Sequence, residues 1–220
     1  MALRRVASVP TRTAFEHRPI KRETFALTHP SLPIKRIRCR TMTRYRRLTT
    51  GPTYFFTVVA YLRRPIFCDP GFRSALRQSI TTVRASRPFT IDAWVLMPNH
   101  MHCIWTLPEK DFDYAKRWGE IKRYVSTLCR ETLHDPSLLK RSNKKHREST
   151  IWQRRFWEHQ IRDDVDFERH MDYVHFNPVK HGFVMNAGEW EHSTFHRYVR
   201  DGMYAQDWGG TVEARTRHWE

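Results

Sequence analysis

The sequence predicts an α+β protein: a ferredoxin-like (split βαβ) antiparallel sheet with helices on one face, plus a C-terminal helix that carries Tyr173. Short runs rich in β-branched and aromatic residues, bounded by Gly and Pro, indicate four strands. Stretches with apolar residues at helical spacing separate these runs. The resulting order, β-α-β-β-α-β-α, is that of the split βαβ plan followed by one more helix.

The run YFFTVVAY at 54–61 indicates the first strand, and apolar residues at helical spacing from Phe72 to Val83 indicate the helix after it. Pro98 and the asparagine after it form a turn that joins the next two strands into a hairpin. Pro178 is expected to end the last helix. The predicted strands cover 54–61, 89–97, 100–107 and 151–161, and the predicted helices cover 70–86, 113–134 and 163–176.

The net charge indicates the kind of partner. The 220 residues include 39 Lys and Arg against 23 Asp and Glu, a formal net charge of +16. Such an excess favours a polyanionic partner, most simply nucleic acid. No apolar run reaches the ~20 residues that a membrane-spanning helix needs, so no membrane partner is expected. The four cysteines are scattered without a CxxC pair, and we expect reduced cytoplasmic thiols.

Charge and composition divide the chain into three parts. Residues 1–41 hold ten Lys or Arg against two Glu, contain four prolines and show no sustained period, so we expect a basic, disordered N-terminal extension. Residues 42–185 are expected to form the folded domain. Residues 186–220 are expected to be a tail whose aromatic side chains pack on or over that domain.

A His-x-His pair lies on the third predicted strand. His100 and His102 alternate with Met101, so the two imidazoles point to the same face, about 7 Å apart at Cα. Such a pair can bind one metal ion, although a catalytic site usually needs a third protein ligand. Taken alone, the pair is explained more simply as two polar residues on the open face of a sheet.

Asn177 can supply that third ligand. Positions four apart lie on one face of a helix, so Tyr173 and Asn177 project together. An amide oxygen suits a hard cation, and the phenol is a candidate nucleophile where a metal polarises a phosphoryl oxygen. The alternative is a buried aromatic residue, with Asn177 capping the helix before Pro178.

With these residues in view, the sequence resembles the REP-associated tyrosine transposases, which are relatives of the HUH single-tyrosine transposases of insertion elements. The resemblance rests on MPNHMH at 97–102 and YVHFNPVKHGFV at 173–184, and on the stretches 54–67, 151–163 and 195–210. These motifs occur in the family's order. The resemblance implies that residues 42–185 form an HUH transposase-like catalytic domain.

The resemblance also implies a site and a reaction. The metal ligands would be His100, His102 and Asn177, the nucleophile Tyr173, and the divalent cation Mg²⁺ or Mn²⁺. The implied enzyme is transposase-like and cleaves and rejoins single-stranded DNA that carries REP-type hairpins, through a covalent 5′-phosphotyrosine intermediate. We expect it in the bacterial cytoplasm, associated with the nucleoid. A monomer is favoured, because one chain supplies both the histidines and the tyrosine.

Cations and aromatic residues interleave at positions that suit single-stranded DNA, which stacks on aromatic faces and lies in basic grooves. Within 152–157, only one face of a strand can reach DNA, because the other belongs to the core, and the sequence does not say which. His175 and Lys180 are close enough to Tyr173 to contact the scissile phosphate. The candidate DNA-binding residues are Arg44, Arg46, Arg47, Trp152, Arg154, Arg155, His175 and Lys180.

Two other functions fit the same sequence. A non-catalytic single-stranded nucleic-acid-binding protein on the same fold would need aromatic residues on its sheet face and would have no use for two histidines. A hydrolytic metalloenzyme would act through His100, His102 and a bound water, and its activity would survive Tyr173→Phe. A covalent protein–DNA adduct distinguishes the strand transferase from both.

Overall fold

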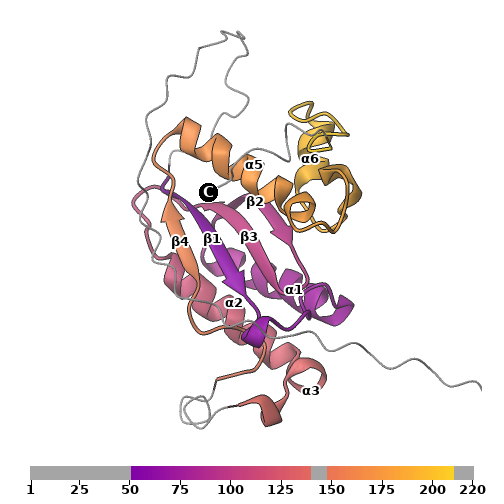
Figure 1. The fold of residues 1–220 in the computed structure, drawn as a ribbon. Helices are drawn as coiled ribbons and strands as arrows, with labels where there is room; N and C mark the ends of the chain where they lie inside the picture. The colour runs from indigo at the N-terminus through magenta and orange to yellow at the C-terminus, as the bar shows by residue number, and fades with distance from the viewer. Residues whose placement is uncertain (1–50, 140–147, 211–220) are drawn as a thin grey trace, which may run out of the picture. The chain divides into compact units, whose positions relative to one another are not determined.

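The computed structural model describes residues 51–139 and 148–210 (Figure 1). The predicted extension at 1–41 and the domain start predicted at residue 42 lie outside the described residues. So do Arg44, Arg46 and Arg47, whose expected contacts with DNA therefore stay predictions.

Four strands form one antiparallel sheet in the order β2-β3-β1-β4. The central strand β1 pairs with β3 on one side and with β4 on the other, and β2 pairs with β3. This order confirms the ferredoxin-like class. The strands are β1 (Thr53–Val59), β2 (Thr90–Leu96), β3 (His100–Thr106) and β4 (Trp157–Gln160).

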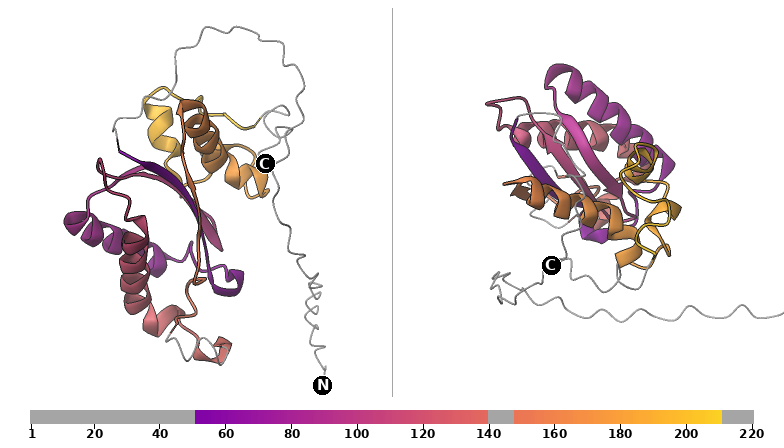
Figure 2. Two further views of the ribbon diagram at one scale, coloured as in Figure 1. Left: turned by 90° about the vertical axis from the view of Figure 1, so that its left-hand side faces the viewer. Right: turned by 90° about the horizontal axis from the view of Figure 1, so that it is seen from above.

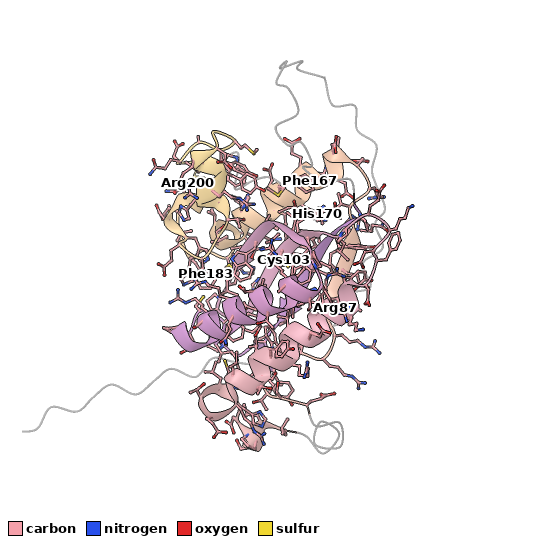
Figure 3. The ribbon with its side chains drawn as sticks, turned by 180° about the vertical axis from the view of Figure 1, so that it is seen from behind. Arg87, Cys103, Phe167, His170, Phe183 and Arg200 are labelled. Carbon is pink, nitrogen blue, oxygen red and sulfur yellow. The ribbon has the colours of Figure 1, made fainter. Side chains whose placement is uncertain are left out.

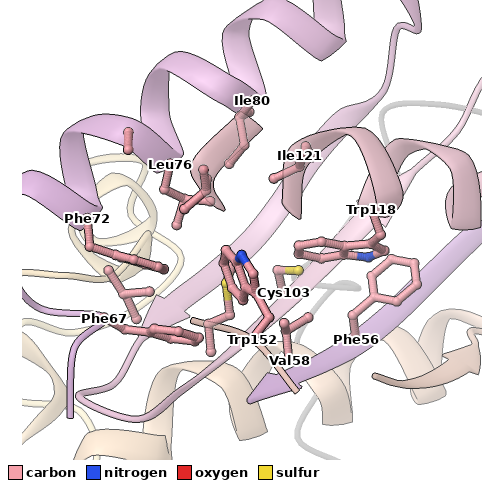
Figure 4. Close-up of a cluster of buried hydrophobic side chains, with 14 of the residues drawn as sticks. Phe56, Val58, Phe67, Phe72, Leu76, Ile80, Cys103, Trp118, Ile121 and Trp152 are labelled. Atoms are coloured by element: carbon pink, nitrogen blue, oxygen red, sulfur yellow. The ribbon is translucent and has the colours of Figure 1, made fainter. Parts of the chain in front are cut away.

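Two helices, α1 (Pro70–Ser86) and α2 (Tyr114–Leu128), cover one face of the sheet, where Figure 3 shows them side by side. Each helix starts at an aspartate whose side chain accepts a backbone N–H of the first turn: Asp69 for α1 and Asp113 for α2. Side chains of the helices and the sheet form a large aromatic core between them (Figure 4). This core includes Phe56, Val58, Phe72, Leu76, Cys103, Trp105, Trp118 and Ile121.

The helix predicted over 113–134 is divided in the structure. Helix α2 ends at Leu128, and the short helix α3 (Arg130–Leu133) follows Cys129. The remaining short elements are the 3-10 helices η1 (Tyr61–Arg63), η2 (Pro136–Leu138) and η3 (Ala187–Glu189).

The opposite face of the sheet is covered by α5 (Asp164–Lys180), with α6 (Phe195–Arg200) beside it (Figure 2). A second core lies here, so the sheet carries helices on both faces once the tyrosine helix is counted. The residues of this core include Phe55, Val95, Ile104, Phe167, Met171, Val174, Phe195, Tyr198 and Tyr204. Several of them follow residue 186, so this part of the chain packs into the sheet's second core.

Helix α5 continues past the point where Pro178 was expected to end it. It runs to Lys180, and Gly182, with φ of 71°, takes the left-handed conformation that follows the helix. Pro178 removes only one N–H in the last turn, and its carbonyl accepts the N–H of Phe183. Asn177 therefore lies inside the helix and does not cap it.

The fourth strand is shorter than predicted. Residues 151–161 were expected to be continuous strand, but only Trp157–Gln160 form β4, and an isolated bridge joins Trp152 to Ala60. Between them the backbone leaves the ladder, and Lys122 Nζ donates to the carbonyl of Gln153 at 3.0 Å. This side-chain donor satisfies a carbonyl that the ladder would otherwise pair.

Among the described residues, none of the helices is long and apolar enough to cross a membrane.

Candidate active site

The two histidines of the His-x-His pair lie on the face of β3 that α5 covers. His100 is 6% exposed and His102 4% exposed, and their ring centroids are 5.0 Å apart. His100 Nδ1 lies 2.7 Å from Asn99 Oδ1, and His102 Nδ1 lies 2.9 Å from Thr57 Oγ1. These contacts fix the orientation of both rings, as hydrogen bonds to the other ring nitrogen do for metal-binding histidines.

Helix α5 brings Tyr173 and Asn177 to the same place. The ring centroid of Tyr173 is 5.1 Å from that of His102. Asn177 is fully buried, and its Oδ1 lies 3.2 Å from His100 Nε2. The four residues predicted from the two motifs therefore converge within one chain, although seventy residues lie between His102 and Tyr173.

The contact between His100 and Asn177 fits a cation. Both nitrogens of His100 face an amide oxygen, Nδ1 that of Asn99 and Nε2 that of Asn177, and a neutral ring carries only one proton. One of the two nitrogens therefore presents a lone pair to an acceptor, and the buried Asn177 Nδ2 makes no hydrogen bond within the described part of the chain. Two acceptors facing one another are unfavourable alone and favourable around a positive ion. The donor set of two imidazoles and one amide oxygen suits Mn²⁺ and accommodates Mg²⁺.

Burial keeps the site's side chains neutral. It lowers the pKa of His100 to about 4, with a further contribution from the charge of His181, and it holds the pKa of His102 well below its usual value. Neutral imidazoles are the form that binds metal. Burial also raises the pKa of the Tyr173 phenol, an effect that the side chain of Asn177 partly offsets.

One cation lies against the ring of the phenol. Lys180 Nζ lies 5.1 Å from the centroid of the Tyr173 ring, in cation–π geometry, and its side chain is exposed. The charge of Arg63 contributes to lowering the pKa of His100. The predicted position of Lys180 beside Tyr173 is therefore found, and the cation is available to an anionic substrate.

Two residues at the site were absent from the sequence prediction. The ring of His181 lies 5.1 Å from that of His100, and it could have been found because it follows Asn177 by four positions on the same helix face. The ring of Phe55 lies 5.4 Å from that of His102 and 5.8 Å from that of Tyr173. An apolar strand residue gives no sequence signal that it borders a polar site.

Two of the candidate DNA-binding residues are buried, and the structure corrects both. Trp152 is 6% exposed, and its ring lies 5.0 Å from that of Phe67 in the core beneath α1 and α2. His175 is fully buried on the side of α5 that faces α6, where its Nε2 lies 3.0 Å from Thr194 Oγ1. Neither side chain can stack on a base or contact the scissile phosphate.

The other predicted contacts in the stretch 152–157 remain accessible. Arg154 is 68% exposed and lies 3.6 Å from Glu148, and Arg155 is also exposed. Their roles in DNA binding stay predictions.

A second group of potential metal ligands lies where β4 meets α5. His159, Asp166 and His170 bring ligand atoms within 4.8 Å of one another. Hydrogen bonds already engage them: His159 Nε2 lies 2.8 Å from Asp166 Oδ2, and His170 Nδ1 lies 2.8 Å from the Asp166 carbonyl oxygen. Because a carbonyl oxygen only accepts, His170 Nδ1 carries a proton and offers no lone pair. Hydrogen bonds among its members therefore account for the proximity of these three residues without a cation.

The fold and the site define a class. Residues 49–177 of the chain, which include the histidine pair on β3 and Tyr173 on α5, match the family model described as Transposase IS200 like. The chain belongs to this family of transposases, which are DNA-processing enzymes.

Within the family, the similar proteins are REP-associated tyrosine transposases. The chain is 45% identical over 172 residues to the REP-associated tyrosine transposase of Escherichia coli (strain K12), covering 78% of this chain and 93% of the relative. A relative from Haemophilus influenzae (strain ATCC 51907 / DSM 11121 / KW20 / Rd) is 40% identical over 184 residues, covering 80% and 98%. A solved REP-associated tyrosine transposase bound to a REP hairpin is 44% identical, with a TM-score of 0.61, and the match covers 78% of this chain and 93% of that one.

Proposed function

We propose that the protein is a metal-dependent single-stranded DNA endonuclease and strand transferase that acts on REP-type hairpins through a 5′-phosphotyrosine intermediate. The observation that carries the proposal is the convergence of one phenol and a neutral three-donor cluster: the Tyr173 ring is 5.1 Å from the ring of His102, and Asn177 Oδ1 is 3.2 Å from His100 Nε2. A binding protein without catalysis has no need of this arrangement.

The proposed reaction exchanges one phosphate ester for another. The Tyr173 oxygen attacks the scissile phosphorus and forms a P–O bond, the bond from phosphorus to the 3′ oxygen breaks, and the phenol's proton is transferred so that a 3′-OH leaves. Bound Mg²⁺ or Mn²⁺ would polarise the phosphate and neutralise part of its charge. Lys180, beside the phenol, favours the developing phenolate and the anionic phosphate. Attack by the 3′-OH on the tyrosyl phosphate reverses the step, which accounts for rejoining.

Two observations support the proposed substrate: the positive net charge and the similarity to a solved relative. The net charge of +16 favours a polyanion, and the solved relative at 44% identity is bound to a REP hairpin. The convergence of all four site residues in one chain supports a monomer as the active form. A DNA substrate supports a location at the nucleoid in the bacterial cytoplasm.

The first test replaces the nucleophile. We expect Tyr173→Phe to abolish both cleavage and the covalent adduct while changing hairpin affinity less than threefold, because one hydroxyl is removed and the ring stays. The measurement uses an end-labelled, hairpin-bearing single strand with Mn²⁺ on a denaturing gel, where the adduct shifts the label. Tyr124→Phe, on the opposite face of the sheet, is the matched control. Cleavage that persists in Tyr173→Phe would indicate the water-dependent metalloenzyme instead.

The second test removes the cation. We expect EDTA to abolish cleavage by the unaltered protein and to leave binding intact, with activity restored by Mn²⁺ or Mg²⁺. His102→Ala should behave as EDTA does, provided that its melting temperature shows a folded protein. Equal loss of binding and cleavage in EDTA and in folded His102→Ala would make the histidines structural.

A further inference from the structure

Trp157 is an exposed aromatic residue on the edge of the sheet. Its side chain belongs to β4, the outermost strand in the order β2-β3-β1-β4, and the residue is 55% exposed. Other tryptophans of the described chain, such as Trp105, Trp118 and Trp152, are buried. A large exposed aromatic ring at a fixed place on a strand is a feature of ligand-binding surfaces.

The sheet register places Trp157 in line with the active site. Trp157 pairs with Thr57 across the β4–β1 ladder, and Thr57 pairs with His102 across the β1–β3 ladder. Cross-strand partners share a face, so Trp157 lies on the same face as His102, two strand spacings or about 10 Å away.

Aromatic rings connect the two positions. The Trp157 ring meets the Phe55 ring edge-on at 5.7 Å, and Phe55 lies between it and the rings of His102 and Tyr173. The ring of His159 lies parallel to that of Trp157 at 6.0 Å, with 5° between the planes. These contacts restrict the orientation of the indole, so a base would stack on a ring whose position is already fixed.

The charge around Trp157 favours a nucleic-acid strand as the occupant. Arg155 precedes it and Arg162 follows it, and both side chains are exposed, Arg162 to 76% although its Nε lies 3.5 Å from Asp166 Oδ2; the neighbouring Glu158 is the exposed acidic residue between them. Exposed arginines on either side of an aromatic platform are the combination that holds single-stranded DNA. A second copy of this chain would bring the same positive charges together, which opposes self-association through this surface.

We propose that Trp157 is the stacking platform for an unpaired base next to the scissile phosphate, so that β4 guides the single-stranded flank of the hairpin towards Tyr173. The proposal rests on the proposed function, because it takes the reactive tyrosine as the destination of the strand. It assigns to Trp157 a positioning role and no part in the chemistry.

The experiment measures binding without cleavage. Fluorescence anisotropy in EDTA compares two labelled oligonucleotides: a hairpin with a single-stranded flank and the same hairpin without it. We expect Trp157→Ala to weaken binding of the flanked hairpin by roughly five- to a hundredfold and to leave the flankless hairpin unchanged. Trp157→Phe should restore most of the affinity. Phe112→Ala, which removes an aromatic ring that is 62% exposed in the connection leading to α2, is the matched control.

Three results would overturn the proposal. The first is unchanged affinity in Trp157→Ala. The second is an equal loss for the two oligonucleotides, which would place Trp157 against the duplex. The third is a change of oligomeric state in analytical ultracentrifugation, which would make the surface a self-association site. Because the readout is binding in EDTA, it is independent of whether Tyr173→Phe abolishes cleavage, so a failure of the proposed function is recognised separately.

Discussion

His100 and His175 show how the surroundings of a buried side chain decide its role. Both rings are buried, and burial lowers the pKa of each. The Nε2 of His175 lies 3.0 Å from Thr194 Oγ1, and that hydroxyl lies 3.2 Å from the carbonyl of Trp94, to which it donates. His175 Nε2 therefore donates to the Thr194 hydroxyl, and this hydrogen bond joins α5 to the segment that leads into α6. The two nitrogens of His100 instead face two amide oxygens, Asn99 Oδ1 and Asn177 Oδ1, and a neutral ring can donate to only one of them, which leaves a lone pair that a cation can use.

The burial of His175 predicts how the stability of the protein changes with pH. Its folded-state pKa is about 3, with burial as the main cause, against ~6.5 in the unfolded chain. Below pH 6.5 the unfolded state therefore binds more protons, and stability falls as the pH falls from 6.5 towards 3. At pH 5 we expect this one residue to account for a loss of about 2 kcal/mol.

Urea denaturation of the unaltered protein and of His175→Gln at pH 7 and pH 5 checks this prediction. The variant is expected to be less stable at pH 7 but to lose about 2 kcal/mol less on acidification, since His100 and His102 titrate in both proteins. Parallel pH profiles would show that His175 does not govern the acid response.

At the scale of elements, α5 is the part that the site depends on, and its first turn is anchored to the sheet. The Asp163 side chain accepts the N–H of Asp166, which caps the helix. Asp166 in turn contacts His159 of β4 and His170 of α5 itself. Burial acts to raise the pKa of Asp166, but the hydrogen bond from His159 and others outweigh it, so the pKa lies below its usual value. The carboxylate thus ties the tyrosine helix to the edge strand.

Weakening the contacts of the Asp166 carboxylate should destabilise the packing of α5 against β4. We expect Asp166→Asn to lower the free energy of unfolding by about 1 to 3 kcal/mol, because it weakens hydrogen bonds to a charged group. It should also slow single-turnover cleavage, since the position of Tyr173 depends on the helix. Asp163→Asn is the control: it removes the same charge in the same turn but keeps a good N-cap residue, and we expect a change below about 0.5 kcal/mol. Equal effects of the two substitutions would mean that only charge matters here.

At the scale of the whole molecule, the excess of positive charge governs affinity. Residues 1–41 carry a net +8, half of the total, and the remaining chain carries the other half. Neutralised phosphates release counterions, so binding to single-stranded DNA weakens with salt, with a logarithmic slope of about −0.7 for each phosphate that the protein neutralises.

A variant that starts at Met42 separates the two halves of the charge. We expect it to cleave at a rate within about threefold of the full chain at saturating DNA, because the site residues are retained. Its affinity should be lower and its slope of log affinity against log salt shallower, by about 0.7 for each phosphate that residues 1–41 neutralise in the full chain. Anisotropy between 50 and 200 mM salt measures both. A slope equal to that of the full chain would show that residues 1–41 do not touch the substrate.

Local periodicity in the sequence predicted the four strands, helices α1, α2 and α5 and their order, but not the short helix α6 at Phe195–Arg200. Alternation along a strand placed His100 and His102 on one face, and the helical period placed Tyr173 with Asn177. Both inferences concern residues at most four apart, where the backbone alone fixes relative direction.

The tertiary structure determined which side chains from distant segments of the chain face one another. Only packing between α5 and the sheet shows that the tyrosine and the histidine pair meet, that His175 points away from them, and that Trp152 is core while Trp157 faces outward. The physical reason is that a pattern of spacing gives the two faces of a strand or helix but not which face is buried. That choice depends on apolar surfaces contributed by segments far away in the chain, and it is made when they pack.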